Sequence, residues 1–359
     1  MTTIQPKHEL IAPTVDPTPI FELFRGNYAT NLLTAAVAHF DVFGQLAARP
    51  LKADDLGAQL QLERRASTVL FTALRAMGLI EPAGGDRLTL SPMAREHLVA
   101  GGPLYIGDYV AQAAHRQSVV ELVERLRTNR AAWTKSDHPD AQGTAFTYRD
   151  GVQSAMDNEE SARRLTLALA GRAKNVAPAL AQAVPMNEAK LLIDVGGGTG
   201  LYAIAFLQKN PELRAVVYDR GQVLKVASQM GHEYRVADRL EMAAGDMFVD
   251  ALPKNADVML LSNVLHDWDV PECRDLVNRC AGALNPGGRL LIHDVFLNDA
   301  MDGPLPIALY SVALFSLTEG RAYSAAEYSQ WLRDAGLSTD GRATPTLVHC
   351  GVLVGTKAP

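Results

Sequence analysis

The spacing of apolar residues divides the chain into a helical first half and a second half in which short strands alternate with helices. Between residues 19 and 101 apolar positions recur every three or four residues, and those at 69, 70, 73, 74 and 77 predict one helix face that ends at Gly78. Two short strands at 79–81 and 87–90, joined through Gly84 and Gly85, would follow. We expect a mainly α-helical winged-helix domain at residues 1–102.

The period of the pattern changes after Pro185. Residues 103–185 are again helical and form a linker region expected to contribute to a substrate pocket. Beyond it, β-like runs alternate with helical stretches, at 190–195, 215–219, 257–261 and 288–296. Alternation of this kind predicts a Rossmann-like α/β domain at 186–359, with a mostly parallel sheet and helices on both faces.

A glycine-rich loop follows the first of these strands, from Asp194 to Gly200. Gly196, Gly198 and Gly200 leave the backbone bare at the start of a helix, so a ligand can approach it closely. The spacing is G-x-G-x-G, which does not match the dinucleotide fingerprint G-x-G-x-x-G. The carboxylate of Asp194 would repel a pyrophosphate but suits the cationic amino-acid part of S-adenosylmethionine, which we expect as the cofactor.

Further carboxylates follow the next strands. Asp219 can accept hydrogen bonds from both ribose hydroxyls, and Asp246 can accept one from the adenine amino group. Met247 and Phe248 would lie near the ring. The alternative for each carboxylate is a solvated loop residue, and for the glycines a tight turn.

A histidine lies where the strand at 257–261 ends. Because ligands of open α/β sheets lie beyond the carboxyl ends of the strands, His266 and Asp267 should reach the ligand crevice, where His266 can act as a general base. Asp294 ends the neighbouring strand and could orient the imidazole. Ser262 and Trp268 are candidate cofactor contacts, although Trp268 also suits the core. A metal site of His266, Asp267 and His293 is an alternative, but strand alternation places His293 on the other side, so we expect no metal.

Together these segments resemble the S-adenosylmethionine-dependent small-molecule O-methyltransferases of plants, of the caffeate and acetylserotonin type, and of bacterial natural-product pathways. The resemblance covers nearly the whole chain and rests on the segments 194–200, 245–248, 265–268 and 285–289. It implies that Gly196, Asp219, Asp246 and Met247 contact the cofactor and that His266 deprotonates an acceptor hydroxyl. S-Adenosylhomocysteine would be the second product.

The chain departs from the family pattern at the two acidic residues that usually flank the catalytic histidine. The first is Asp294, one methylene shorter than the usual Glu, and Ala322 stands where the second is typical. Relatives that keep the cofactor but catalyse hydroxylation, decarboxylation or ring closure are therefore the alternative. The sequence also leaves open whether oxygen, nitrogen or carbon is methylated.

The acceptor is expected to be a small, largely apolar, aromatic molecule, and its identity is open. The residues that would line its pocket are His115, Phe146, Met156, Leu314, Phe315 and Leu317. For each of them, plain core packing is the alternative.

Composition narrows the class of protein. The net charge is −6, and residues 1–100 carry nine Lys and Arg against ten Asp and Glu, so the basic face that DNA binding needs is absent and a winged-helix regulator is disfavoured. We expect no nucleic-acid partner and a homodimer built on the apolar N-terminal helices. Three cysteines and no apolar run of membrane length predict a cytoplasmic enzyme without a membrane partner.

Overall fold

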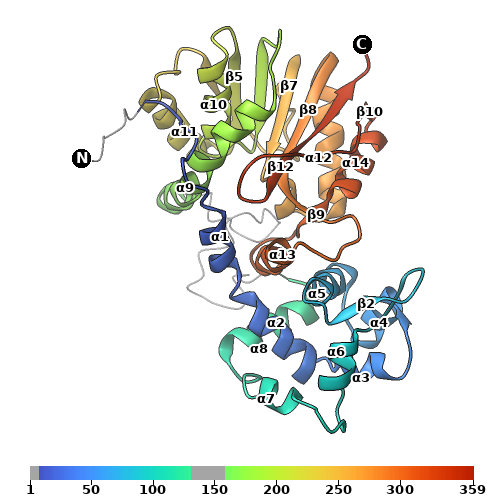
Figure 1. Ribbon diagram of the computed structural model, residues 1–359. Helices are drawn as coiled ribbons and strands as arrows, with labels where there is room; N and C mark the ends of the chain where they lie inside the picture. Colours follow the sequence, from blue (N-terminus) through green and yellow to red (C-terminus); the bar gives the residue numbers. More distant parts are fainter. Residues whose placement is uncertain (1–7, 131–157) are drawn as a thin grey trace. The chain divides into compact units, whose positions relative to one another are not determined.

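The computed structural model describes residues 8–130 and 158–359, which fall into two compact units (Figure 1). The sheet unit contains residues 8–19, 158–296 and 323–359, and the helical unit contains residues 20–130 and 297–322. The chain thus crosses between the units several times.

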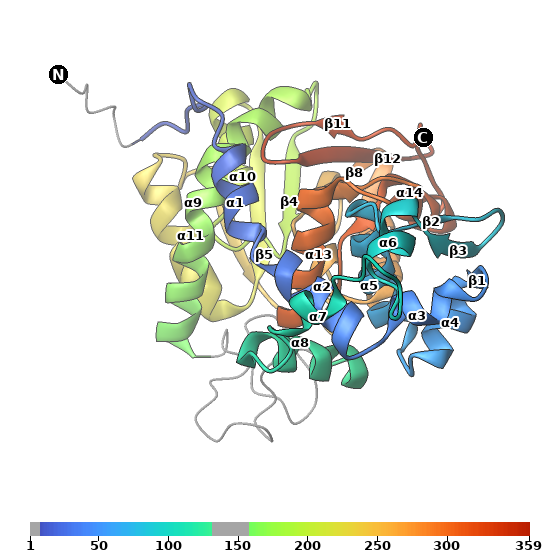
Figure 2. The ribbon, with the colours of Figure 1, turned by 60° about the horizontal axis from the view of Figure 1, so that its bottom comes forward.

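The sheet unit is built on a mostly parallel sheet, as predicted. Its strand order is β10-β12-β8-β7-β4-β5-β6, in which β4 to β8 are parallel and β12 pairs antiparallel with β8 and β10. Two short strands extend it: β9 pairs with β8, and β11 pairs with β12, beside which it lies in Figure 2. The bounds are β4 Leu191–Val195, β5 Arg214–Asp219, β6 Leu240–Ala244, β7 Ala256–Ser262, β8 Leu284–Leu297, β9 Tyr323–Ser324, β10 Leu337–Ser338, β11 Thr344–Pro345 and β12 Cys350–Lys357.

Helices cover both faces of this sheet. Helices α9 (Glu159–Ala183), α10 (Leu201–Lys209) and α11 (Gly221–Glu233) pack together on one face, and α12 (Val270–Ala283) and α14 (Ala325–Asp334) pack on the other (Figure 1). The β4 segment is apolar and fully buried at Leu192, Ile193 and Val195, which explains a run without polar alternation. The carboxyl ends of β4, β5 and β7 therefore lie at one edge of a rigid scaffold.

The helical unit has the element order expected for a winged helix. Helix α5 ends at Ala76 and Gly78 follows at φ 71°, and β2 and β3 form the predicted hairpin with β1 beside β3. The bounds are α1 Thr18–Arg25, α2 Tyr28–Ala38, α3 Val42–Ala47, β1 Leu51–Lys52, α4 Ala53–Gln59, α5 Arg64–Ala76, β2 Ile80–Pro82, β3 Arg87–Leu90, α6 Pro92–His97, α7 Gly107–Ala111, α8 Gln117–Thr128 and α13 Leu305–Leu317.

Two features differ from the expected layout. Helix α13 lies in the helical unit, although residues 297–322 were expected within 186–359, because its apolar surface packs against α5 and α2. The turn expected at 285–288 lies inside β8, where the pairing with β7 shifts between Ala256 and Val258. The functional boundaries at 102 and 185 stay predictions, because packing units alone do not assign function.

The described residues contain no helix that is long and apolar enough to cross a membrane. The three cysteines, Cys273, Cys280 and Cys350, are buried, and none of them forms a disulfide bond.

Candidate active site

The glycine loop joins the end of β4 to the start of α10. Gly196 has φ 67°, and a Cβ there would lie 2.9 Å from Val264 Cγ2, so the backbone conformation and the space both require glycine. A Cβ on Gly197 would lie 2.8 Å from Cγ of Asp194. The carboxyl of Asp194 therefore lies directly beneath the loop.

Asp194 is fully buried, and no described group donates a well-formed hydrogen bond to either of its carboxylate oxygens. Burial, and to a smaller extent the charge of Asp219, raises the pKa of Asp194 to about 8. Burying an ionised carboxylate that lacks a well-formed hydrogen bond costs free energy. Its ionised form would be stabilised by a cationic ligand group above the loop.

Asp219 ends the neighbouring strand β5 and is held by two backbone groups. The N–H of Gly198 donates to its Oδ2 at 2.9 Å and the N–H of Arg220 to its Oδ1 at 2.7 Å. The carboxylate is thus fixed against the glycine loop, and its contact with the ribose hydroxyls stays a prediction. Burial raises the pKa of Asp219 despite these two bonds.

Asp246 lies beyond the end of β6, beside a pocket of about 400 Å³. Its Oδ1 accepts from the N–H of Phe248 at 2.9 Å, and its Oδ2 accepts from Nη1 of Arg220 at 2.9 Å. The pocket is lined by Arg220, Gly221, Gln222, Ala244, Gly245, Asp246 and Asp250. The structure thus adds a cation, Arg220, which the sequence analysis did not single out.

Phe248 and Trp268 pack edge to face, with ring centroids 4.6 Å apart. Trp268 is only 4% exposed, and its carbonyl accepts a 2.6 Å hydrogen bond from the hydroxyl of Tyr323. Met247 packs against the same core cluster. Trp268 therefore serves as core at this position, which was one of the two expected roles, and its contact with the cofactor stays a prediction.

His266 and Asp294 form a buried pair, as predicted from the neighbouring strands β7 and β8. Nδ1 of His266 lies 2.5 Å from Oδ1 of Asp294, which also accepts from the N–H of Val295 at 2.7 Å. The hydroxyl of Tyr328 donates to Oδ2 at 3.0 Å. Sequence reasoning missed Tyr328, because only the packing of α14 on the sheet brings it to Asp294.

The charges around His266 favour a strong base. Burial alone would lower the pKa of His266, but the neighbouring charges of Asp294 and Asp267 outweigh it and the pKa is raised. Burial would raise the pKa of Asp294, and the His266 charge and hydrogen bond keep it below its ordinary value. An ionised carboxylate only accepts, so Nδ1 carries the proton and Nε2 is the basic nitrogen.

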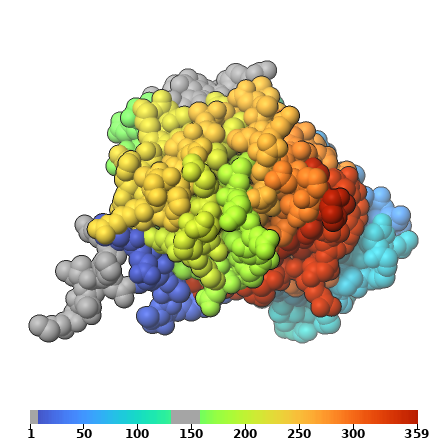
Figure 3. Space-filling model, turned by 90° about the horizontal axis from the view of Figure 1, so that it is seen from above, coloured from blue at the N-terminus to red at the C-terminus, as the bar shows by residue number. Residues whose placement is uncertain are grey.

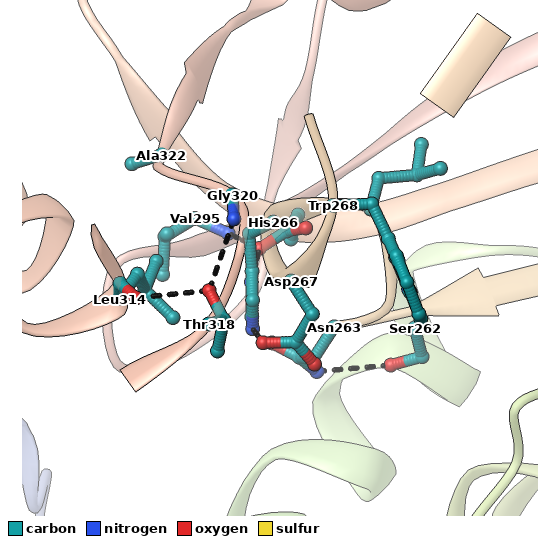
Figure 4. A network of polar contacts seen from close by, with 12 residues as sticks. Ser262, Asn263, His266, Asp267, Trp268, Val295, Leu314, Thr318, Gly320 and Ala322 are labelled. Atoms are coloured by element: carbon teal, nitrogen blue, oxygen red, sulfur yellow. Dashed lines mark hydrogen bonds and ion pairs between the residues drawn. The ribbon is translucent and has the colours of Figure 1, made fainter. Parts of the chain in front are cut away.

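Asp267 lies on the other side of the imidazole, with Oδ1 3.7 Å from Nε2 of His266 (Figure 4). That distance is too long for a hydrogen bond but short enough for electrostatic attraction. Burial raises the pKa of Asp267 to about 6. Asp267 thus lies beside the basic nitrogen without blocking it by a direct bond.

His293 has a different environment, on the opposite side of β8. Its Nδ1 lies 2.8 Å from Oγ of Ser262 and its Nε2 lies 3.1 Å from Oγ1 of Thr346. Asn263, next along the chain, donates to Ser262 Oγ at 3.1 Å (Figure 4). Burial lowers the pKa of His293 to about 3, so the ring is neutral. His293 therefore links Ser262 to Thr346, and the contact of Ser262 with the cofactor stays a prediction. The described residues contain no group of three or more His, Cys, Asp and Glu side chains that could hold a metal ion.

The residues predicted for the acceptor pocket belong to the helical unit or lie outside the described residues. His115 is exposed, Leu317 is 51% exposed and Leu314 is buried. Phe315 is fully buried with the guanidinium of Arg65 4.5 Å from its ring centroid, so it packs in the core of its unit. Phe146 and Met156 lie outside the described residues. For all six residues, the role in an acceptor pocket stays a prediction.

The segment after Leu314 is fixed by local hydrogen bonds. Thr318 Oγ1 donates to the carbonyl of Leu314 and accepts from the N–H of Gly320 (Figure 4). Ala322 is fully buried, and its N–H donates to Oγ of Ser311 at 3.1 Å. This position therefore holds a methyl group and supplies no second acid.

Known proteins resemble this chain over nearly its whole length. Residues 130–338 match the family described as O-methyltransferase domain. The 3-hydroxy-5-methyl-1-naphthoate 3-O-methyltransferase of Streptomyces sahachiroi is 34% identical over 95% of this chain and 96% of its own. The tetracenomycin polyketide synthesis 8-O-methyl transferase TcmO of Streptomyces glaucescens is 31% identical over 95% and 97%.

A solved structure of an O-methyltransferase has the same fold as this chain. The O-methyltransferase family 2 protein of Planctomyces limnophilus, in complex with apigenin, is 45% identical to this chain. It superimposes with a TM-score of 0.86 and covers 97% of this chain and 98% of its own.

Proposed function

The chain belongs to the O-methyltransferase domain family and is an S-adenosylmethionine-dependent enzyme, and from this premise we propose that it methylates a phenolic hydroxyl of a small aromatic acceptor with His266 as general base. The observation that carries the proposal is the buried pair of His266, which follows β7, and Asp294 of β8, with Nε2 left as the basic nitrogen. The aromatic substrates in the names of the two Streptomyces relatives support the acceptor class.

The residues around the glycine loop suit the cofactor. The unsatisfied carboxyl of Asp194 fits an ammonium group, Asp219 fits the ribose hydroxyls and Asp246 fits the adenine amino group. A Cβ on Gly198 would meet nothing within 4 Å, so a ligand can approach the backbone there, and Phe248 and Met247 supply apolar surface near the base. When bound, S-adenosylmethionine supplies a methyl group on a positively charged sulfur.

The chain's own residues would then remove the proton from the acceptor hydroxyl. A phenol has a pKa near 10, so about one molecule in a thousand is ionised at neutral pH. His266 Nε2 takes the proton as the oxygen attacks, and Asp294 stabilises the imidazolium that forms. Asp267, 3.7 Å from Nε2, adds to that stabilisation.

We further propose a homodimer that forms through the helical unit, and a cytoplasmic location. Three residues of α1 support the first: Ile20, Leu23 and Phe24 are 70%, 83% and 81% exposed. The three buried cysteines, none of which forms a disulfide bond, support the cytoplasmic location.

A methyl-transfer assay on a library of phenols with radiolabelled S-adenosylmethionine tests the proposal. His266→Ala should lower kcat by about 10² to 10⁴ and leave cofactor affinity nearly intact. His232→Ala, which removes an exposed histidine of α11, is the matched control and should keep wild-type turnover. Near-full turnover of a folded His266→Ala variant would show that this base is wrongly assigned, and transfer only to nitrogen or carbon would refute the acceptor class.

A further inference from the structure

Arg220 contacts both Asp219 and Asp246, the two carboxylates that are proposed to bind the ribose and the adenine of the cofactor. Its backbone N–H donates to Asp219 Oδ1 at 2.7 Å, and its guanidinium Nη1 donates to Asp246 Oδ2 at 2.9 Å. The residue is the N-cap of α11, so its backbone is fixed by the start of that helix. One residue thus sets the position of both acidic groups.

Asp246 is held from several directions, and Arg220 supplies the contact to Oδ2. The N–H of Phe248 occupies one position on Oδ1, and the hydroxyl of Tyr218 donates to the Asp246 carbonyl at 3.2 Å. Each carboxylate oxygen can accept more than one hydrogen bond, so Oδ2 can accept from Arg220 and from a ligand amino group together. Without Arg220, Oδ2 of Asp246 loses the hydrogen bond from the guanidinium, and the carboxylate can rotate.

Charge balance gives Arg220 a second effect on the same pocket. The residues that line it include the acidic Asp246 and Asp250 and one cation, Arg220. Arg220 and Asp246 are 33% and 22% exposed at their side chains, and so exposed an ion pair adds little to folding stability. The main consequence of this ion pair is therefore local, because Arg220 holds the Asp246 carboxylate in one orientation at the wall of the pocket.

We propose that Arg220 is a positioning residue that sets the cofactor's base specificity, by holding Asp246 as an acceptor for the 6-amino group of adenine. This inference rests on the proposed placement of adenine at Asp246. A 6-oxo purine presents an oxygen at the same place and is repelled by the fixed carboxylate. Discrimination between 6-amino and 6-oxo bases thus depends on the guanidinium.

Calorimetric binding of S-adenosylhomocysteine and of its 6-oxo analogue S-inosylhomocysteine tests this directly. The wild type should favour the 6-amino ligand by about 10- to 100-fold, the factor for one hydrogen bond to a charged group. Arg220→Met should reduce that ratio to within about threefold, mostly by weakening S-adenosylhomocysteine. Arg220→Lys should restore most of the ratio, because an ammonium can still pair with Oδ2.

Arg214→Met is the matched control, since it removes an exposed arginine that pairs with Glu241 at the opposite end of β5, and its ratio should equal that of the wild type. If Arg220→Met folds poorly, Arg220→Gln removes the same charge with a smaller change of polarity and should show the same fall. A wild type that does not discriminate overturns the placement of adenine at Asp246 together with this inference. A discriminating wild type whose ratio survives in Arg220→Met overturns the role of Arg220 alone.

Discussion

The hydroxyl of Tyr328 donates to Oδ2 of Asp294 while Oδ1 of the same carboxylate lies 2.5 Å from Nδ1 of His266. Helix α14 thereby restrains the residue that orients the proposed base. The side chain of Tyr328 is itself fully buried among Tyr323, Trp331 and Phe296, so it has little freedom to move away. The aromatic cluster that contains Tyr328 is thus connected to the proposed base by the hydrogen bond from Tyr328 to Asp294.

Asp294→Asn and Tyr328→Phe should shift the acidic limb of the kcat profile in opposite directions. The base must be neutral to act, so activity rises as pH rises through the pKa of His266, which is raised in the wild type. Asp294→Asn removes the charge that raises this pKa, so the limb should move to lower pH while the plateau falls about tenfold or more. Tyr328→Phe removes a donor from the carboxylate and should move the limb to higher pH.

The measurement is kcat against pH for each variant under saturating substrates. Tyr323→Phe removes a hydroxyl from the same aromatic cluster, one that donates to the Trp268 carbonyl, and should leave the limb in place. Equal shifts in Tyr323→Phe and Tyr328→Phe would mean that general loosening of the cluster, and no specific bond to Asp294, is responsible.

Cofactor binding should release a proton from Asp194. Its pKa is raised to about 8, so at pH 7 the carboxyl of the ligand-free protein is mostly protonated, and a cationic group above it favours the ionised form. Affinity for S-adenosylmethionine should therefore increase as pH rises from about 5 to 8 and level off above. Calorimetry in two buffers of different ionisation enthalpy measures the proton released, and Asp194→Asn should release none.

Asp219→Ala should weaken S-adenosylmethionine binding by about 1.5 to 3 kcal/mol, the range for a lost hydrogen bond to a charged group. The variant also removes the acceptor of the Gly198 and Arg220 N–H groups, so the loop loses a fixed contact. Titration calorimetry checks the value. Asp238→Ala, an exposed aspartate of the same unit, is the control. Unchanged affinity in Asp219→Ala, or a preference for a dinucleotide, would contradict the assignment.

The homodimer prediction can be tested on helix α1. Leu23→Glu with Phe24→Glu puts two charges on a highly exposed apolar face, which should prevent any association that buries it. Light scattering at micromolar concentration should show a dimer for the wild type and a monomer for the double variant. Val249→Glu changes an equally exposed apolar residue of the sheet unit and should remain dimeric. An active monomeric wild type would refute the prediction.

Stability at low pH should depend on His293. The pKa of this ring is lowered to about 3 in the folded chain, so between pH 6.5 and 3 the unfolded state binds a proton that the folded state does not. Unfolding free energy should then fall as pH falls through this window, by up to about 1.4 kcal/mol per pH unit for this one group. Denaturant titrations of the wild type and His293→Gln compare the slopes, and the variant should be the flatter of the two.

The sequence predicted the parts of the site that depend on strand ends. Strand period and turn residues place Asp194, Asp219 and His266 at carboxyl ends, and parallel pairing of β7 with β8 brings Asp294 beside His266. These relationships follow from local pattern plus one topological rule. The contacts of Tyr328 and Arg220 do not, because each depends on where a helix or a long side chain lies across the sheet edge.

Helix α13 illustrates the other limit of sequence reasoning. Its residues are apolar on nearly every side, so periodicity cannot indicate which neighbour they cover. The chain order suggested the C-terminal domain, and the structure places the helix with α5 and α2. Packing that joins distant segments cannot be read from one segment's pattern.

The antiparallel strand β12 has a consequence for how the protein is made. It pairs with residues 289–295 of β8, and the space-filling view shows red atoms from near the C-terminus against orange ones (Figure 3). A ribosome delivers residues 350–357 after every other described strand, so residues 289–295 of β8 lack their β12 partner until then. We therefore expect the nascent chain to be most prone to aggregation, and to need chaperones most, in the interval between the emergence of β8 and that of β12.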